Sequence, residues 1–308
     1  MSAYSPVLDV SRPFQIERSA LRGRAVRLGH TIDRVLTAHA YPQGVSLLLG
    51  ELLVLAGGFA GALKYDGTFS LQVRGDGPVG LMVADVGNDG AMRGYASFDR
   101  EDPPADSLHG LAALVGRGVL ALTVDQSRTG GKTYQGVVEL GDRTLQDAML
   151  GYFQRSEQVP TGIRAAVRFD EEAARWHAGA VVVQAMPDEG GTAFQPRGSD
   201  AEDDWRRAML LLQTLSDEEL LDPSLSLDDL LVRLFHEDGV RVFDPLDLSF
   251  ACSCDEDRVR RVLAGFGAAE LEEMRDEEGA VTVTCEFCSR VYRFDEAGLR
   301  DLEGSSTN

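Results

Sequence analysis

The sequence predicts an α+β protein with three parts: an N-terminal, mostly antiparallel sheet with packed helices, a helical linker and a small C-terminal domain. Three observations support this assignment. Short alternating apolar runs separated by glycine turns occupy residues 66–140, two helix-capping patterns begin leucine-rich segments within 216–235, and all four cysteines lie within 252–288. We place the domains at 1–197, 198–240 and 241–308, because a chain of 308 residues is long enough for more than one domain.

The distribution of charge supports a boundary near residue 198. The formal net charge is −20, and residues 198–308 hold 28 acidic and 11 basic side chains, so this part carries −17 and residues 1–197 carry only −3. So acidic a surface repels phosphate backbones and anionic lipids. We therefore expect neither a nucleic-acid nor a membrane partner.

The first strong element is an apolar segment from Val45 to Leu63, whose length approaches that of a membrane span. Glu51 would be costly in lipid, and four glycines would weaken an isolated helix. We therefore predict a buried core helix in which small residues let other elements pack closely. These residues are Gly50, Gly57, Gly58 and Gly61.

Alternating strands follow the core helix. Asp-Gly and Asn-Asp-Gly turns separate runs with a two-residue period, which is typical of an antiparallel meander. The predicted strands are 68–73, 79–86, 92–98, 119–125, 133–140, 163–169 and 180–186, the predicted helices are 105–115 and 145–155, and Pro187 ends the domain.

The linker begins with a helix predicted over 200–215 and then carries two capping patterns. Ser216 has Glu219 three residues later, and Ser226 has Asp229 at the same offset. Helices this short persist mainly by docking an apolar face, so the region is either an ordinary packed subdomain or a layer whose docking depends on its neighbours. The predicted docking stripe of the last helix is Leu227, Leu230, Leu231, Leu234 and Phe235.

The cysteines form a Cys-x-Cys pair, Cys252 and Cys254, and after thirty residues a Cys-x-x-Cys pair, Cys285 and Cys288. Such a pattern can supply four thiolates to one tetrahedral Zn²⁺. Structural disulfides are disfavoured because the N-terminus lacks a secretory signal, and unrelated buried thiols would be scattered through the chain. The five histidines lie outside the cysteine stretch, so none is needed as a ligand: His30, His39, His109, His177 and His236.

Zinc would hold the sulfurs in the nucleophilic, oxidisable thiolate form, and their oxidation to disulfides would remove ligands. Spacing alone does not decide between such a redox switch and a static structural site. The C-terminal zinc-binding domain has little other apolar material, and a metal can contribute on the order of 10 kcal/mol to such a fold. Its predicted helices are 255–264, 268–276 and 296–302, and its strands are 280–284 and 291–294.

Motifs of enzymes are absent from the pattern. Gly131-Lys132-Thr133 resembles the end of a phosphate-binding loop, but Gln126 stands where the first glycine is required. Gly75-Asp76-Gly77 is followed by a strand, which a dinucleotide fingerprint does not allow. No Ser/His/Asp arrangement or carboxylate pair stands out, so no catalytic residue is predicted.

Over its full length the chain resembles the redox-regulated bacterial chaperones of the heat-shock protein 33 family. The cysteine pattern carries the resemblance most specifically. Further matching segments, in chain order, are Gly75-Asp76-Gly77-Pro78, Arg93-Gly94-Tyr95, 134–138, 152–161, 184–187, 233–237 and Asp244-Pro245.

The resemblance implies an ATP-independent holdase rather than an enzyme, inactive while Cys252, Cys254, Cys285 and Cys288 hold one Zn²⁺. It implies that peroxide under unfolding conditions, or hypochlorous acid, forms Cys252–Cys254 and Cys285–Cys288 disulfides. Zinc release would unfold the linker, expose hydrophobic surface to unfolding client proteins and accompany formation of a homodimer. A cytoplasmic location is expected. The alternative is a zinc-stabilised interaction adaptor without a redox switch.

Overall fold

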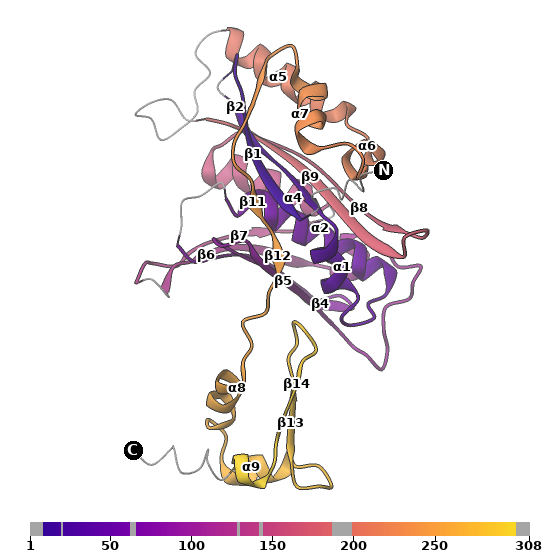
Figure 1. Cartoon of the computed structure of the whole chain (residues 1–308), viewed down its shortest axis with the longest axis vertical. Coiled ribbons are helices and arrows are strands. Elements are labelled where there is room, and N and C mark those ends of the chain that lie inside the picture. Colours follow the sequence, from indigo (N-terminus) through magenta and orange to yellow (C-terminus); the bar gives the residue numbers. More distant parts are fainter. Residues whose placement is uncertain are drawn as a thin grey trace, which may run out of the picture. The chain divides into compact units, whose positions relative to one another are not determined.

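The computed structural model describes residues 9–19, 21–61, 66–127, 130–141, 144–186 and 199–299. It divides the chain into two compact units, which meet between Phe250 and Ala251 (Figure 1). The first unit holds two extensive sheets and most of the helices. The second is small and contains all four cysteines. Each unit is described by itself.

Within the described residues, the first unit contains two six-stranded sheets. One has the order β10-β1-β2-β9-β8, with β11 also paired to β1, and the other has the order β12-β5-β4-β3-β6-β7. Their pairs are antiparallel except for β12 with β5, which confirms the predicted fold class. The strands of the first sheet are β1 Val10–Ile16, β2 Leu21–Leu28, β8 Thr161–Asp170, β9 Arg175–Ala185, β10 Val240–Val242 and β11 Leu246–Asp247. Those of the second are β3 Thr68–Gly75, β4 Val79–Gly87, β5 Ala91–Phe98, β6 Gly118–Asp125, β7 Tyr134–Glu139 and β12 Ser249–Phe250.

Helix α2, Gln43–Phe59, is the core helix that the sequence predicts, although it begins two residues earlier and ends before the predicted Leu63, which lies outside the described residues. It packs against both sheets. A Cβ at Gly57 would lie 3.2 Å from Val26 of β2 and 3.4 Å from Met92 of β5, so the small residue lets both sheets approach. Among the described helices, none is long and apolar enough to cross a membrane.

Three further helices of the first unit differ from the prediction. Helix α1, His30–Leu36, and strands β1 and β2 before it were not predicted. The predicted helix 105–115 is reduced to α3, Leu111–Val115, because Gly110 takes a positive φ of 85° and starts the helix late. The predicted helix 145–155 is α4, Leu145–Tyr152, followed by a π-helical turn at Phe153–Glu157.

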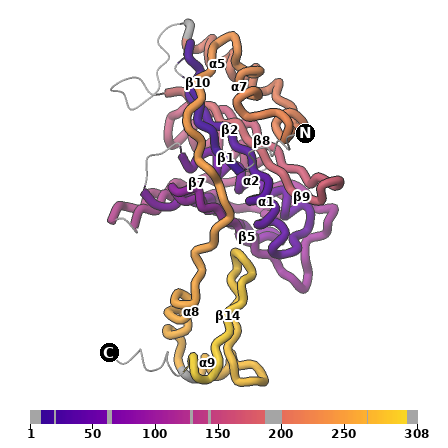
Figure 2. Tube along the Cα trace, in the orientation of Figure 1, coloured from indigo at the N-terminus to yellow at the C-terminus, as the bar shows by residue number. Residues whose placement is uncertain are grey.

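The linker forms the three predicted helices: α5 Ser199–Thr214, α6 Asp217–Leu221 and α7 Leu227–Phe235. Both predicted caps are present, since Ser216 accepts from the Glu219 amide and Ser226 from the Asp229 amide. The helices pack on the face of the first sheet opposite α2 (Figures 1 and 2). We call this segment, residues 199–235, the helical layer, and the sheet surface beneath it the outer face. The whole predicted stripe of α7 is buried there: Leu227, Leu230, Leu231, Leu234 and Phe235.

The chain returns to the sheets after the helical layer. Val240–Val242 and Leu246–Asp247 pair with β1, and Ser249–Phe250 pairs with β5. The prediction assigned residues 241–250 to the C-terminal domain, whereas in the structure they complete the sheets of the first unit. Cys252 therefore follows the end of β12 after a single residue.

The second unit contains α8 Glu256–Leu263, α9 Ala268–Glu273 and the hairpin β13 Val281–Thr284 with β14 Val291–Phe294, as predicted. A helical turn occupies 296–299, and the rest of the predicted helix 296–302 lies outside the described residues. The described core is small. Its clustered buried side chains are Leu263, Leu271, Val281, Phe294 and Leu299.

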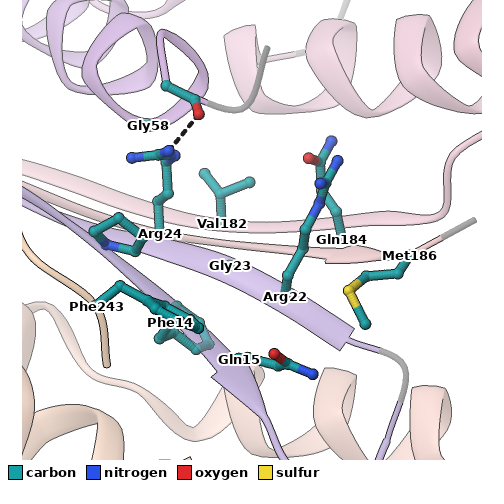
Figure 3. Close-up of a pocket in the computed structure, with 12 residues that line it drawn as sticks. Phe14, Gln15, Arg22, Gly23, Arg24, Gly58, Val182, Gln184, Met186 and Phe243 are labelled. Carbon is teal, nitrogen blue, oxygen red and sulfur yellow. Dashed lines mark hydrogen bonds between the residues drawn. The ribbon is translucent and has the colours of Figure 1, made fainter. Parts of the chain in front are cut away.

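Strand β2 delivers arginines to both sides of the first sheet. Arg22 and Arg24 line a cavity of about 220 Å³ on the side of α2, where Arg24 donates to the Gly61 carbonyl just beyond the end of that helix (Figure 3). Arg27 points to the other side, towards the helical layer. The two sides therefore place arginine in different environments, a solvent-open cavity and a buried interface.

Candidate metal centre

The four cysteines come from two segments that the fold of the second unit brings together. Cys252 and Cys254 lie in an irregular stretch before α8, so the backbone does not hold them in a straight strand. Cys285 and Cys288 lie in the turn between β13 and β14. There the Ser289 amide donates to the Cys285 carbonyl and the Cys285 amide to Arg290, both at 2.9 Å, which folds the backbone tightly around the second pair.

The sulfurs form one compact cluster. Cys252 Sγ lies 3.7 Å from Cys285 Sγ, Cys254 Sγ lies 3.3 Å from Cys288 Sγ, and all four atoms lie within 4.8 Å of one another. Tetrahedral Zn²⁺ with Zn–S bonds of about 2.3 Å requires S–S separations of roughly 3.8 Å. The arrangement and the soft thiolate donors therefore fit zinc, and the predicted ligand residues meet at one point.

The electrostatics of the cluster favour a bound cation. Burial raises the pKa of Cys252 and raises the pKa of Cys288 to about 12. Burial also acts to raise the pKa of Cys254, but the Tyr292 hydroxyl and the neighbouring thiols outweigh it and lower that pKa to about 7. Thiols this close cannot all ionise together unless a positive charge stabilises them. A divalent cation would do so, and it would then hold every sulfur as thiolate.

The cluster is also accessible to chemistry. All four cysteines are only partly buried, so a small oxidant can reach the sulfurs. Close sulfur pairs join different segments of the chain, Cys252 with Cys285 and Cys254 with Cys288. A metal in the cluster would thus link residues 33 and 34 positions apart. With so small a core around it, this crosslink would contribute much of the stability of the second unit.

Sequence reasoning missed Tyr292, whose nearby hydroxyl acts to lower the pKa of Cys254. Its position in an alternating strand gave no sign of this, because its place beside the cluster depends on the hairpin register. Tyr292 pairs with Val283, and Thr284 pairs with Val291 next to the turn that holds Cys285 and Cys288.

Sequence reasoning also missed Arg27, which fixes the helical layer to the outer face. Its guanidinium is buried and donates to the Leu220 carbonyl at 2.9 and 3.2 Å and to the Leu225 carbonyl at 2.5 Å. Burial lowers the pKa of Arg27, although nearby Asp222 partly offsets this. Burying this cation costs desolvation free energy, which the carbonyls at the end of α6 and in the following loop repay only in part. A layer that stayed docked permanently would gain little from such a costly contact.

Two outer contacts reinforce this arrangement. Arg12 of β1 forms an ion pair with Asp228 of α7 at 3.0 Å. Arg164 of β8 forms one with Asp217 of α6 at 2.6 Å and also donates to the Leu215 carbonyl. The acidic linker thus meets basic side chains of the sheet, which gives the uneven charge of the sequence a structural role.

Comparison with known proteins identifies the family. The family model described as Hsp33 protein matches residues 9–295. The 33 kDa chaperonin of Caulobacter vibrioides is 42% identical over 296 residues, covering 94% of this chain and 96% of the relative. That of Ectopseudomonas mendocina is 37% identical over 295 residues, covering 96% and 95%. The crystal structure of the 33 kDa chaperonin (heat shock protein 33 homolog) from Thermotoga maritima has a TM-score of 0.77 at 22% identity, covering 96% of this chain and 98% of that one, and so shares the fold. By sequence over nearly its whole length, this chain belongs to the Hsp33 family.

Proposed function

We propose that this protein is a redox-regulated, ATP-independent holdase that is inactive when reduced and bound to zinc. One observation carries the proposal: the four thiols converge in a unit whose described core cluster has only five buried apolar side chains, so a metal bound to them would be a major long-range link. The names of its relatives, which are 33 kDa chaperonins, support a chaperone. The residues that act are cysteines, and no catalytic turnover is involved.

The switching step is an oxidation of the thiolates. Two disulfides form from four thiolates, which gives up four electrons and requires two equivalents of a two-electron oxidant such as hypochlorous acid or peroxide. Each disulfide removes two ligands, so zinc is released. By resemblance to the family, the bonds are Cys252–Cys254 and Cys285–Cys288.

This pairing would change the fold more than the alternative one would. Bonds across the cluster, Cys252–Cys285 and Cys254–Cys288, would keep the long-range link that the metal supplies. Bonds within each pair close only short loops and leave the two segments unlinked, so they restrain the unfolded chain far less. Oxidation within the pairs should therefore unfold the second unit.

Unfolding is expected to spread to the helical layer. Cys252 follows β12 after a single residue, and β10 to β12 connect the zinc unit to α7, so loss of the metal frees the end of this segment. Helices α6 and α7 have only 5 and 9 residues and depend on docking. Their release would expose the leucine stripe of α7 and the outer face to unfolding client proteins, with homodimer formation in the oxidised state. The high negative charge of the linker would keep the opened form soluble.

The proposed setting is the bacterial cytoplasm. Reducing conditions there keep thiols free and favour the metal-bound state, and an oxidative burst would reverse that balance. After stress, reduction and zinc rebinding would restore the docked layer and release clients to other folding factors.

The proposal can be tested on the reduced, zinc-loaded protein. Hypochlorous acid should release one zinc per chain, detected with a chromogenic chelator, and the same sample should then suppress light scattering by a heat-aggregating client. Untreated protein is the control. Retention of zinc, or release without any suppression of aggregation, would contradict the switch and would favour a zinc-stabilised adaptor.

The disulfide pairing has its own test. Non-reducing peptide mapping of the oxidised protein should find bonds within each pair. Cross-pair bonds would contradict the route from oxidation to unfolding. Cys288→Ser leaves three thiolates, so it should bind zinc more weakly and lose normal redox control of chaperone activity.

A further inference from the structure

The outer face of the first sheet has a repeating charge pattern across its strands. In one cross-strand row, Arg12, Ala25, Val181 and Arg164 are register partners on β1, β2, β9 and β8. The row therefore has an apolar centre and an arginine at each end. With about 4.8 Å between neighbouring strands, the two terminal Cα atoms lie roughly 14 Å apart.

The adjacent row deepens the apolar centre. It consists of Val10, Arg27, Gly179 and Ala166. At Gly179 an added Cβ would lie 2.8 Å from Leu220 Cγ, so α6 rests directly on the backbone there. Leu220 therefore lies beside the buried Arg27. Together the rows form a shallow apolar floor with cations at its rims and one within it.

The helical layer shows what this surface accepts. It presents leucines to the floor, as in the stack of Phe235 on Phe14, whose ring centroids are 5.9 Å apart. At the rims it presents Asp228 to Arg12 and Asp217 to Arg164. In the structure, this surface is thus covered by an amphipathic helical segment of the same chain with carboxylates on both flanks.

We propose that the outer face, once the helical layer leaves it, binds acidic amphipathic helical segments of client proteins. The inference rests on the proposed function, because the layer must undock for the face to open. The departing segment takes its carboxylates with it, so Arg27 and Arg164 lose the carbonyl and acidic partners that the layer supplies, and Arg12 loses Asp228 while it keeps the Phe243 carbonyl. A client segment that supplies both leucines and flanking carboxylates satisfies them, whereas a basic segment places like charges together.

The rim pairs should make this preference sensitive to salt. The Arg12 and Asp228 side chains are 25% and 45% exposed, and those of Arg164 and Asp217 are 35% and 53% exposed. Pairs this open to solvent are screened by ions. The rims therefore contribute selectivity, while the floor contributes binding that salt does not weaken.

The test uses full-length protein oxidised with hypochlorous acid and a fluorescent peptide with the sequence of residues 216–237. A second peptide carries Asp217→Lys and Asp228→Lys, which reverses the rim charges. A third carries Glu218→Lys and Glu237→Lys, which makes the same change in net charge at two exposed residues outside the rim pairs. Binding is followed by fluorescence anisotropy at low and high salt.

We expect the rim-reversed peptide to bind roughly tenfold more weakly than the native one at low salt. The third peptide should lose clearly less affinity. The difference should disappear at high salt and in the protein variant Arg12→Gln with Arg164→Gln. The variant Arg74→Gln with Arg117→Gln is the matched control and should keep the difference, because both side chains are exposed, Arg74 on β3 of the other sheet and Arg117 just before β6.

Several outcomes would overturn the inference while leaving the proposed function intact. One is equal binding of all three peptides by oxidised protein that still suppresses client aggregation. Another is a preference that survives loss of Arg12 and Arg164, and a third is no peptide binding by that active protein. If the oxidised protein does not suppress aggregation at all, the proposed function fails and the inference fails with it.

Discussion

The two faces of the first sheet are covered in different ways. The inner face meets α2, a helix that is buried along nearly its whole length and has Glu51 as its one ionisable residue. The outer face meets three separate helices of 16, 5 and 9 residues, which carry many carboxylates and are held partly by arginines. The same sheet thus has one apolar cover and one charged, segmented cover.

This difference indicates which of the two covers can undock from the first sheet. Removing α2 would expose a continuous core shared by both sheets, and it would return only one ionisable side chain of that helix, Glu51, to water. Undocking the helical layer exposes leucines too, but it also returns Arg27 to water and frees acidic side chains to be solvated. The outer cover is therefore the one whose docking the proposed loss of zinc could decide.

The largest expected effect on stability comes from equivalent leucine-to-alanine substitutions in the two covers. Leu53→Ala in α2 should lower the free energy of unfolding of the whole first unit by about 2–5 kcal/mol, because Leu53 is fully buried between the sheets. Leu231→Ala in α7 deletes the same atoms from an equally buried site. Its loss should appear instead as easier release of the helical layer.

Proteolysis and urea denaturation would distinguish these two outcomes. The reduced Leu231→Ala protein should be cleaved faster within 199–235 while the sheets keep most of their stability. Val232→Ala, on the same helix but 52% exposed, is the control and should change stability by under about 0.5 kcal/mol. Equal global destabilisation by Leu53→Ala and Leu231→Ala would break the comparison.

A smaller effect is expected from adding a side-chain atom to the sheet directly beneath α6. Gly179→Ala places a Cβ 2.8 Å from Leu220 Cγ and 3.1 Å from its carbonyl oxygen, so the layer must shift. Docking should weaken by about 1–3 kcal/mol, and the reduced protein should suppress client aggregation in part without oxidation. Gly80→Ala, with no atom near the new Cβ, should behave as the parent protein. If the Gly179→Ala protein suppressed aggregation only after oxidation, as the parent protein should, this would argue against a helical layer whose docking controls activity.

The smallest effect concerns the inner face and depends on pH. Burial raises the pKa of Glu51, although Gln146 donates to it at 3.0 Å. A raised carboxyl pKa means that ionisation costs stability once the pH exceeds the ordinary glutamate value, so Glu51→Gln should raise the melting temperature at pH 7. The gain should shrink as the pH falls to that ordinary value. A loss of stability at pH 7 would show that the charged form is favoured instead.

Much of this architecture was predictable because its signals are local. The core helix, the meander and the capped linker helices follow from periodicity, turn dipeptides and Ser caps. The cysteine cluster was predictable for a similar reason, since the cysteine spacing is itself the signal. The four predicted ligands meet within 4.8 Å, close enough to hold a metal ion.

The elements that were missed depend on partners far along the chain. Strand β2 has three arginines and a glycine, so its alternation is obscure until α2 and the helical layer cover its two sides. The burial of Arg27 requires carbonyls 193 and 198 positions away. Likewise, the last strands of the first unit could not be assigned because their pairing with β1 and β5 is non-local.

Hydrogen exchange before and after oxidation tests the central claim most directly, namely that the zinc cluster controls the outer cover and not the inner one. Backbone amides of α7 and α2 would be compared in reduced, zinc-loaded protein and in protein oxidised with hypochlorous acid. We predict that exchange in α7 accelerates at least about tenfold on oxidation while α2 remains protected. Unchanged protection of α7, or loss of protection in both helices together, would contradict the account.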